Sequence, residues 1–317
     1  MPEEGWLAKA LKGVNLPKIF LGPAGEAVSR LIGGVADIPA AGLERISARI
    51  RSKTEGERKV SKAITEAVKG HVTADAELIE RAANTLISKE LRKQSNKEAI
   101  ARKTIEHLQD DSKEEDAPQM PDEDWFNMFE QYAEQASSEK LQDMWARVLA
   151  GEIRRRHSFS LKTLRFVSEL DQEVASTFEK WNSRVVADFI PKPTKMEGAE
   201  LTEILLLEDF GLVTGGHGFL SKNVTISGGG ITFPYPGKAL HIVADTGTSI
   251  KIPALLLSRV GKEIASILPR VTTREDAMTL CNAIPKNKGV NRIVFGDHVG
   301  DSILNLEVLW ERDQQEG

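Results

Sequence analysis

Histidine, cysteine and paired carboxylates are the side chains that most often bind metals or transfer protons. Six histidines are spread along the chain: His71, His107, His157, His217, His241 and His298. None has zinc-ligand spacing, and no His-Glu-x-x-His unit occurs. The single cysteine, Cys281, allows neither an intramolecular disulfide nor a thiolate cluster, and fits a reducing compartment. The sequence therefore predicts no metal site and no cofactor.

Two glycine-rich segments and one Asp-His pair remain as candidates for catalysis. The segments 215–218 and 228–230 lack the Lys and Ser/Thr that hold phosphate and magnesium in a Walker loop, so we interpret them as turns. Asp297 precedes His298, and adjacent residues on a strand point to opposite faces, which argues against a catalytic pair. We therefore expect no catalytic residues, and a protein that is not an enzyme.

The sharpest charged feature is a cluster of cations near the middle of the chain. It could neutralise the phosphates of nucleic acid or of an anionic lipid. Alternatively, cations at the end of a helix over 141–153 complement its dipole, which is the interpretation we favour. The net charge of -5 gives no reason to expect a general nucleic-acid binder, so nucleic acid is allowed as a partner but not favoured. The candidate anion-binding residues are Arg154, Arg155, Arg156, Lys162 and Arg165.

A second candidate surface lies in the first fifty residues. Apolar residues recur there at helical spacing in short segments that prolines interrupt, and basic residues follow. An amphipathic segment of this kind can insert its apolar face at an anionic membrane surface. The same residues could instead pack against sister subunits or against the rest of the chain. The candidate membrane or assembly residues are Trp6, Leu7, Leu11, Val28, Leu31, Ile32, Val35, Arg45 and Arg49.

The elements that must position these residues are mainly helices. A length of 317 residues exceeds the usual size of one hydrophobic core, which predicts several domains. We expect an amphipathic and charged helical region over 1–109, an acidic linker over 110–121, and a four-helix unit over 122–190. Trp125, Trp145 and Trp181 lie on apolar helical stripes of this unit and are expected to share one core.

The apolar periodicity changes after about residue 190. Helices are expected over 201–210, 258–268 and 274–284, and strands over 231–235, 240–244, 250–252, 292–295 and 304–310. The strands 240–244 and 250–252 are expected to form a hairpin through 245–249. Residues 197–317 are therefore predicted to be an α+β domain with a winged-helix-like core. The fold class is mainly α with a C-terminal α+β domain.

The sequence also bears on cellular location. The first residues carry acids where a secretory signal carries Lys or Arg, and charges interrupt the most apolar stretch, 14–43. We expect neither export nor a membrane-spanning helix. The expected location is the cytoplasm, with peripheral contact to the inner membrane as an option.

The middle of the chain resembles a known family. The residues Asp124-Trp125-Phe126 together with 139–153 and 158–164 are similar to an uncharacterised bacterial domain-of-unknown-function family, DUF2806-like. Residues 77–82, Gln94-Ser95-Asn96 and 257–264 are similar to it as well. Its helical unit is similar to that of Abi-alpha-like, abortive-infection proteins of phage defence. The family often has a proline-containing turn after the Gly-Glu-Ile at 151–153, where this chain has 154–157. The resemblance implies no catalytic residues.

Together, the resemblance and the apolar stripes lead to a functional hypothesis. We expect a non-enzymatic bacterial antiphage effector or sensor that acts by self-assembly, by contact with the inner-membrane surface, or by both. Its expected partners are further copies of itself, a phage protein or inner-membrane lipid. The alternative is a winged-helix-like regulatory protein that binds nucleic acid.

Overall fold

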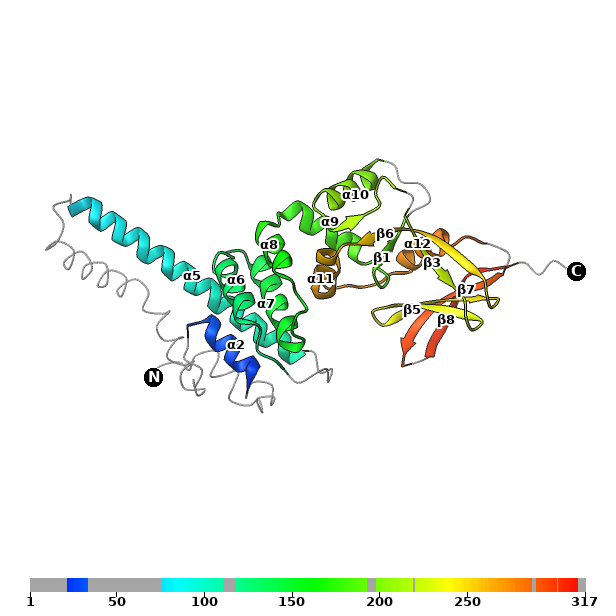
Figure 1. Ribbon diagram of the computed structural model, residues 1–317, viewed down its shortest axis with the longest axis horizontal. Helices are drawn as coiled ribbons and strands as arrows, with labels where there is room; N and C mark the ends of the chain where they lie inside the picture. Colours follow the sequence, from blue (N-terminus) through cyan, green and yellow to red (C-terminus); the bar gives the residue numbers. More distant parts are fainter. Residues whose placement is uncertain are drawn as a thin grey trace, which may run out of the picture. The chain divides into compact units, whose positions relative to one another are not determined.

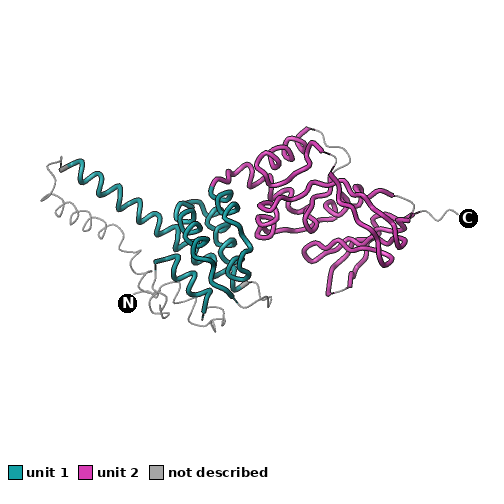
Figure 2. The backbone as a smooth tube through the Cα atoms, viewed as in Figure 1, with its two compact units in different colours: residues 1–168 teal, residues 169–317 magenta. Residues whose placement is uncertain are grey.

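The computed structural model describes residues 22–33, 76–110, 118–192, 198–218, 220–286, 289–300 and 302–312. The chain divides into two units, residues 1–168 and 169–317, each of which is described by itself (Figure 2). This division differs from the predicted domains. The expected four-helix unit over 122–190 is split, because its first three helices belong to the first unit and its last helix to the second.

The described part of the first unit is helical (Figure 1). Its helices are α2 (Pro23–Leu31), α5 (Ala76–Asp110), α6 (Glu123–Ala133), α7 (Glu139–Arg154) and α8 (Leu161–Glu169). The long helix α5 packs along α7, so the acidic segment predicted to be a linker does not separate two domains. Ser138 caps α7 by accepting a hydrogen bond from the backbone N–H of Leu141.

Aromatic rings fill the core of the first unit. Phe129 stacks on Trp125, and its ring meets Trp145 edge to face, with 5.3 Å between ring centroids in both pairs. The indole N–H of Trp125 donates to the carbonyl oxygen of Phe159 at 2.7 Å. Trp181 does not share this core, which corrects the prediction. It belongs to the second unit, where its indole N–H donates to Glu203 at 2.8 Å.

Amide side chains of α5 hold the ends of two neighbouring helices. The Gln94 side chain donates to the carbonyl oxygen of Ile32, just after α2, at 2.9 Å. Asn96 donates in the same way to the carbonyl oxygen of Glu134, just after α6. Carbonyl groups at helix ends have no partner within the helix, so these contacts satisfy them. The helix α2 is thereby tied to the first unit.

The second unit is an α+β domain, which confirms the predicted fold class. It begins with α9 (Gln172–Asn182), β1 (Phe189–Pro191), α10 (Ala199–Asp209), β2 (Val213–Thr214), β3 (Ser221–Thr225), β4 (Gly230–Tyr235), β5 (Lys238–Ala244) and β6 (Ser249–Leu257). It continues with α11 (Arg259–Ile267), α12 (Arg274–Ala283), β7 (Val290–Val299) and β8 (Ser302–Glu311).

A four-stranded sheet with the helices α10 and α11 forms one part of this unit. Its sheet has the order β1-β6-β2, and β3 extends it by pairing with β6. The helix α10 connects β1 to β2, the strand β6 returns between them, and α11 follows. The helix α11 lies very close to β2, because a Cβ on Gly261 would be 2.1 Å from the carbonyl oxygen of Leu212. Glycine at this position therefore permits the packing.

The second sheet is antiparallel, with the order β4-β5-β7-β8. Its inner face forms a core with α12 and β6, and includes Phe233, Leu240, Ile293 and Phe295. The predicted hairpin between 240–244 and 250–252 is wrong. Both edges of β5 are occupied by β4 and β7, while β6 pairs with strands of the first sheet. Alternation of apolar residues identified the strands correctly but carries no information about their partners.

Candidate protein-interaction surface

The two edges of the second sheet differ in their chemistry. The edge strand β4 contains Pro234, which has no N–H to donate to a further strand. The other edge strand, β8, has ten residues and contains neither proline nor lysine. Three of its aliphatic side chains are exposed: Leu304 by 51%, Leu306 by 56% and Val308 by 40%. We call these three residues the β8 aliphatic edge.

The strand β8 is irregular at two places. Its register against β7 shifts between Ile293 and Val294 and again between Phe295 and Asp297. At the second shift Asn305 has a φ of 50° and donates from its amide to Asp297 at 2.7 Å. Gly296 permits this bulge, because a Cβ there would lie 2.3 Å from the carbonyl oxygen of Leu304. Such bulges interrupt the row of backbone groups that a free edge offers to another strand.

The acidic residues of β8 are paired within the chain. Arg274 of α12 contacts Glu307 with 2.5 Å between Nε and Oε1. Arg292 of β7 contacts Glu311 at 3.5 Å. These carboxylates therefore offer little uncompensated charge to an approaching surface, and the aliphatic side chains dominate the edge.

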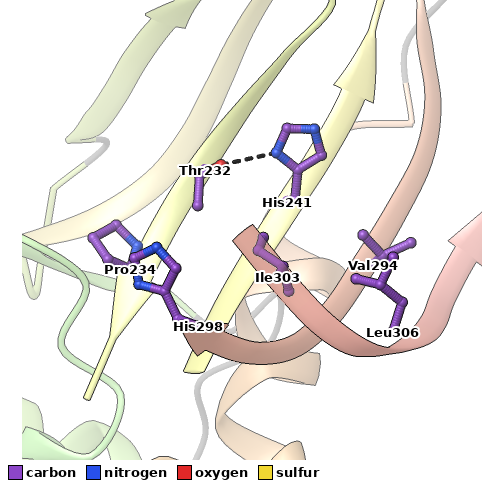
Figure 3. Close-up of a pocket in the computed structure, with 7 residues that line it drawn as sticks. All are labelled: Thr232, Pro234, His241, Val294, His298, Ile303 and Leu306. Carbon is purple, nitrogen blue, oxygen red and sulfur yellow. Dashed lines mark hydrogen bonds between the residues drawn. The ribbon is translucent and has the colours of Figure 1, made fainter. Parts of the chain in front are cut away.

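A shallow hollow of about 530 Å³ lies on the outer face of this sheet, next to the β8 aliphatic edge (Figure 3). Its lining comes from all four strands: Thr232 and Pro234 from β4, His241 from β5, Val294 and His298 from β7, and Ile303 and Leu306 from β8. The Nδ1 atom of His241 lies 2.9 Å from Oγ1 of Thr232. Burial lowers the pKa of His241, which favours its neutral form. The hollow thus combines aliphatic side chains with polar ones.

Asp297 and His298 were not expected to form a catalytic pair, and their side chains have different surroundings in the structure. The Asp297 carboxylate binds Lys238 at 2.5 Å and Asn305, and these contacts lower its pKa. His298 instead lines the outer hollow. Among the described residues, no group of three or more His, Cys, Asp or Glu is placed to hold a metal ion.

The glycine-rich segment 215–218 is a turn that the chain itself holds. Lys192 donates from Nζ to the carbonyl oxygens of Gly215, Gly216 and Gly218 at 3.1, 3.0 and 2.9 Å. The N–H groups of Gly215 and Gly216 donate to the Glu208 carboxylate. A phosphate could therefore use these N–H groups only by displacing Glu208.

The predicted anion-binding cluster is partly used for contacts within the first unit. Arg154 donates to the carbonyl oxygen of His107 at 2.5 Å, and Arg156 forms an ion pair with Asp122. Asp122 precedes α6 but makes no side-chain capping bond to it. Arg155, Lys162 and Arg165 are exposed. The position of Arg154 in the last turn of α7 fits the helix-dipole interpretation.

A buried carboxylate holds the turn that carries these cations. Glu152 is 1% exposed and accepts hydrogen bonds from the backbone N–H groups of His157 and Phe159 at 2.6 and 3.0 Å. His157 has a φ of 66°, and Gly151 faces the Phe159 ring so closely that a Cβ would lie 2.7 Å from it. Burial nevertheless raises the pKa of Glu152 above its ordinary value of 4.5, against the opposing effect of these N–H groups.

This raised pKa predicts how Glu152 affects stability as a function of pH. The folded state binds the Glu152 proton more tightly than the unfolded state, so its contribution stabilises at low pH and is lost as pH rises through the folded-state pKa. The free energy of unfolding of the wild type minus that of Glu152→Gln should therefore fall as the pH rises from the ordinary glutamate pKa of 4.5 through the raised folded-state pKa. Denaturant titrations of both proteins across this range measure the difference. A difference that stays flat or rises contradicts the prediction.

Three of the candidate membrane or assembly residues near the N-terminus lie in the described part of the chain and are buried in it; we call these three the N-terminal stripe. Val28, Leu31 and Ile32 are 5%, 0% and 7% exposed, and α2 packs against α5 and α7. Arg30 lies over the Phe126 ring, 4.7 Å from its centre. These three apolar residues therefore pack against the rest of the chain, which was one of the alternatives considered for them. The other candidate residues lie outside the described part of the chain: Trp6, Leu7, Leu11, Val35, Arg45 and Arg49.

The helix α10 bears on the nucleic-acid alternative. It connects β1 to β2, the first two strands of the sheet with the order β1-β6-β2. Its eleven residues include four acids and no Lys or Arg. Glu200 and Glu203 bind Arg184 and Lys180 of the same unit. An acidic helix of this kind opposes the approach of phosphates.

Comparison with known proteins matches one part of the chain to a family. Residues 80–189 match the family described as "Protein of unknown function (DUF2806)", which confirms the resemblance over this range. The matched range contains the Trp125, Gly151 and Glu152 positions discussed above and ends at β1. Residues 257–264 and the β8 aliphatic edge lie outside it. No curated protein and no solved structure matches the chain.

The exposure of the β8 aliphatic edge was not predicted from the sequence. The alternation of Leu304, Leu306 and Val308 with Asn305 and Glu307 predicted a strand, and β8 is one. Alternating aliphatic residues usually indicate a core-facing side. Glu307, which lies between the exposed aliphatic residues, forms an ion pair with Arg274, which is distant in the sequence.

Proposed function

We propose that the protein is a non-enzymatic bacterial effector or sensor of phage defence that works by protein association through its C-terminal sheet. The observation that carries the proposal is the β8 aliphatic edge. Ten large hydrophobic residues are exposed among those described, and four of them lie between 299 and 308. Single exposed hydrophobics are common on protein surfaces, whereas clusters mark sites of interaction.

The geometry of the sheet supports association at this place. The inner face is covered by the unit's own core, and the β4 edge contains Pro234. Leu306 lines the outer hollow and Val308 pairs with Val294 beside it, and the acids of β8 form ion pairs inside the chain. A hydrophobic centre with few uncompensated charges is typical of the buried part of a protein interface.

The buried N-terminal stripe affects which mode of action we favour. Val28, Leu31 and Ile32 are used for packing within the first unit, so they present no apolar face to a bilayer. No helix among the described residues is long and apolar enough to cross a membrane. We therefore place association with protein, in the cytoplasm, ahead of contact with the inner membrane. The role in phage defence rests on the resemblance to abortive-infection proteins.

The nucleic-acid alternative has no comparable support. The helix α10 is acidic, and Arg154 and Arg156 are engaged by groups of the first unit. We do not propose it as a second function.

The proposed function is tested by phage challenge of cells that contain the wild type, the double variant Leu306→Glu with Val308→Glu, or no protein. Because a carboxylate on an apolar interface must lose its water, the double variant should lose protection. Val271→Glu is the matched control, since Val271 is 80% exposed in a loop of the same unit. The readouts are plaque number, protein level and membrane integrity.

The expected result is protection by the wild type and by Val271→Glu, and loss of protection in the double variant at equal protein level. If the wild type gives no protection against a broad phage panel, the defence role is rejected. If the double variant protects as well as the wild type, association through the C-terminal sheet is rejected.

A further inference from the structure

We propose that Arg156 and His157 form a binding site for one phosphate group, either free or as a monoester, which the carboxylate of Asp122 occupies when no ligand is bound. Both residues follow α7, in the turn that Glu152 holds. The site lies in the first unit, so this inference goes beyond the proposed function and does not depend on it.

The carboxylate of Asp122 shows how an oxyanion binds here. Its Oδ1 atom forms an ion pair with the guanidinium of Arg156, and its Oδ2 atom lies 3.3 Å from Nδ1 of His157. The side chains of Arg156 and Asp122 are partly exposed and that of His157 is largely exposed, so a ligand in solution can reach all three. Two donors that bind two oxygens of the same acid form an arrangement by which proteins recognise carboxylates and phosphates.

The backbone of His157 indicates that its side chain is needed at this place. Its φ of 66° lies in the left-handed region, which glycine adopts without steric cost and other residues adopt uncommonly. The buried carboxylate of Glu152 fixes this conformation by accepting hydrogen bonds from the N–H groups of His157 and Phe159. Residues held in such backbone regions are frequent at binding sites. The turn therefore holds the imidazole at a fixed place beside the carboxylate of Asp122.

The displacement of Asp122 from this site costs little. Ion pairs between exposed groups contribute little to stability, because water solvates the separated charges well. Asp122 is also the N-cap residue of α6, yet its side chain makes no capping bond. Once a ligand takes its place, the carboxylate of Asp122 is free to accept from the N–H groups in the first turn of α6, which offsets the loss of the ion pair.

The chemistry of the site favours a phosphate over another carboxylate. A phosphate monoester carries a charge of about -1.5 to -2 at pH 7 and has three acceptor oxygens, so it attracts a guanidinium and an imidazole more strongly than Asp122 does. Arg155 is exposed on the same turn and adds a positive charge. Binding of nucleic acid, by contrast, depends on contacts to several phosphates. One arginine and one histidine on a short turn fit a single phosphate group.

The first test measures the binding of inorganic phosphate and of O-phosphoserine to the full-length protein at constant ionic strength. The line width of the phosphorus NMR signal over a range of protein concentrations gives the Kd for each probe. The wild type should bind at least one of them. Asp122→Asn should bind that probe about tenfold more tightly, because the competing side chain has lost its charge. Asparagine still serves as an N-cap residue, so α6 should be unaffected.

The second test uses His157→Gly to separate a binding role from a structural one. Because glycine adopts the left-handed conformation without strain, this variant should keep the thermal stability of the wild type. Its Kd for phosphate should nevertheless rise about tenfold, as should that of Arg156→Gln. Arg92→Gln is the matched control, since Arg92 is an exposed arginine of α5 in the same unit. Its Kd should equal that of the wild type.

The proposal is rejected if neither probe binds to the wild type or to Asp122→Asn. Binding by Asp122→Asn that is no tighter than that of the wild type overturns the displacement of Asp122. If His157→Gly binds as well as the wild type, or if Arg92→Gln loses binding, general positive charge holds the phosphate and the site is overturned. Tighter binding of O-phosphoserine identifies a monoester as the ligand, and tighter binding of inorganic phosphate identifies free phosphate. The phage challenge of the β8 variants is independent of these results.

Discussion

Replacing Trp145 by alanine is expected to lower the free energy of unfolding of the first unit by about 3 to 5 kcal/mol, the usual cost of removing a large buried aromatic ring. Trp145 is 0% exposed and touches both Phe129 and Tyr132, with ring centroids 5.3 and 6.2 Å apart. Phe129 in turn stacks on Trp125, whose indole holds Phe159. The cavity would thus open at the centre of the aromatic core.

Trp145→Phe is the matched control for this prediction. The indole N–H of Trp145 is buried and has no hydrogen-bond partner among the described residues, so phenylalanine removes no hydrogen bond and keeps a ring in contact with Phe129. Its cost should be well under half that of alanine. Because the protein has two units, denaturant-dependent hydrogen exchange should be used to assign the loss to residues 1–168. A loss below about 1 kcal/mol for Trp145→Ala would show that this face is not core.

Replacing Gly261 by valine is expected to destabilise the second unit at the contact of α11 with β2 by about 3 kcal/mol, the upper part of the range for overpacking. A Cβ at this position would lie 2.1 Å from the carbonyl oxygen of Leu212 and 3.1 Å from its carbonyl carbon. Both are backbone atoms, so no side-chain rotation relieves the clash. The same carbonyl oxygen accepts a hydrogen bond from the N–H of Ser258 at 3.0 Å. Separating α11 from β2 would therefore also weaken the start of α11.

Gly228→Val is the control for the change of glycine to valine. A Cβ on Gly228 would meet nothing within 4 Å, and its φ is not in the left-handed region. Its effect should be small. Hydrogen exchange measured by mass spectrometry should show faster exchange in α11 and β6 of Gly261→Val and unchanged exchange in the first unit. Equal stability of the two glycine variants would contradict the packing of α11 described here.

The local structure of this protein could be predicted well from its sequence. Helices over 201–210, 258–268 and 274–284 correspond to α10, α11 and α12, and the predicted strands correspond to β4 to β8. Asp171 caps α9 by accepting a hydrogen bond from the backbone N–H of Val174 at 2.8 Å. These features depend on residues a few positions apart, because the periodicity of apolar residues and the end groups of helices are local properties.

The choice of partner for each element could not be predicted in this way. The apolar stripe of Trp181 indicated a buried helix face, but only the fold shows that this face packs in the second unit. Likewise, β5 and β6 are consecutive strands, yet their partners lie in two different sheets. The stripe of Val28, Leu31 and Ile32 is equally compatible with a membrane, a subunit interface or α5, and in the fold it packs against α5 and α7.

By itself, the sequence determined which segments are helices and strands, the α+β character of the C-terminal part, and the resemblance of residues 80–189 to DUF2806. Only the tertiary structure decided which apolar faces are covered and which charges are paired. It buried the N-terminal stripe, engaged Arg154 and Arg156, and left the β8 aliphatic edge open. The physical reason is that the type of a side chain determines whether it is favourable to bury it or to pair its charge. The group that covers it or pairs with it comes from residues far away in the chain.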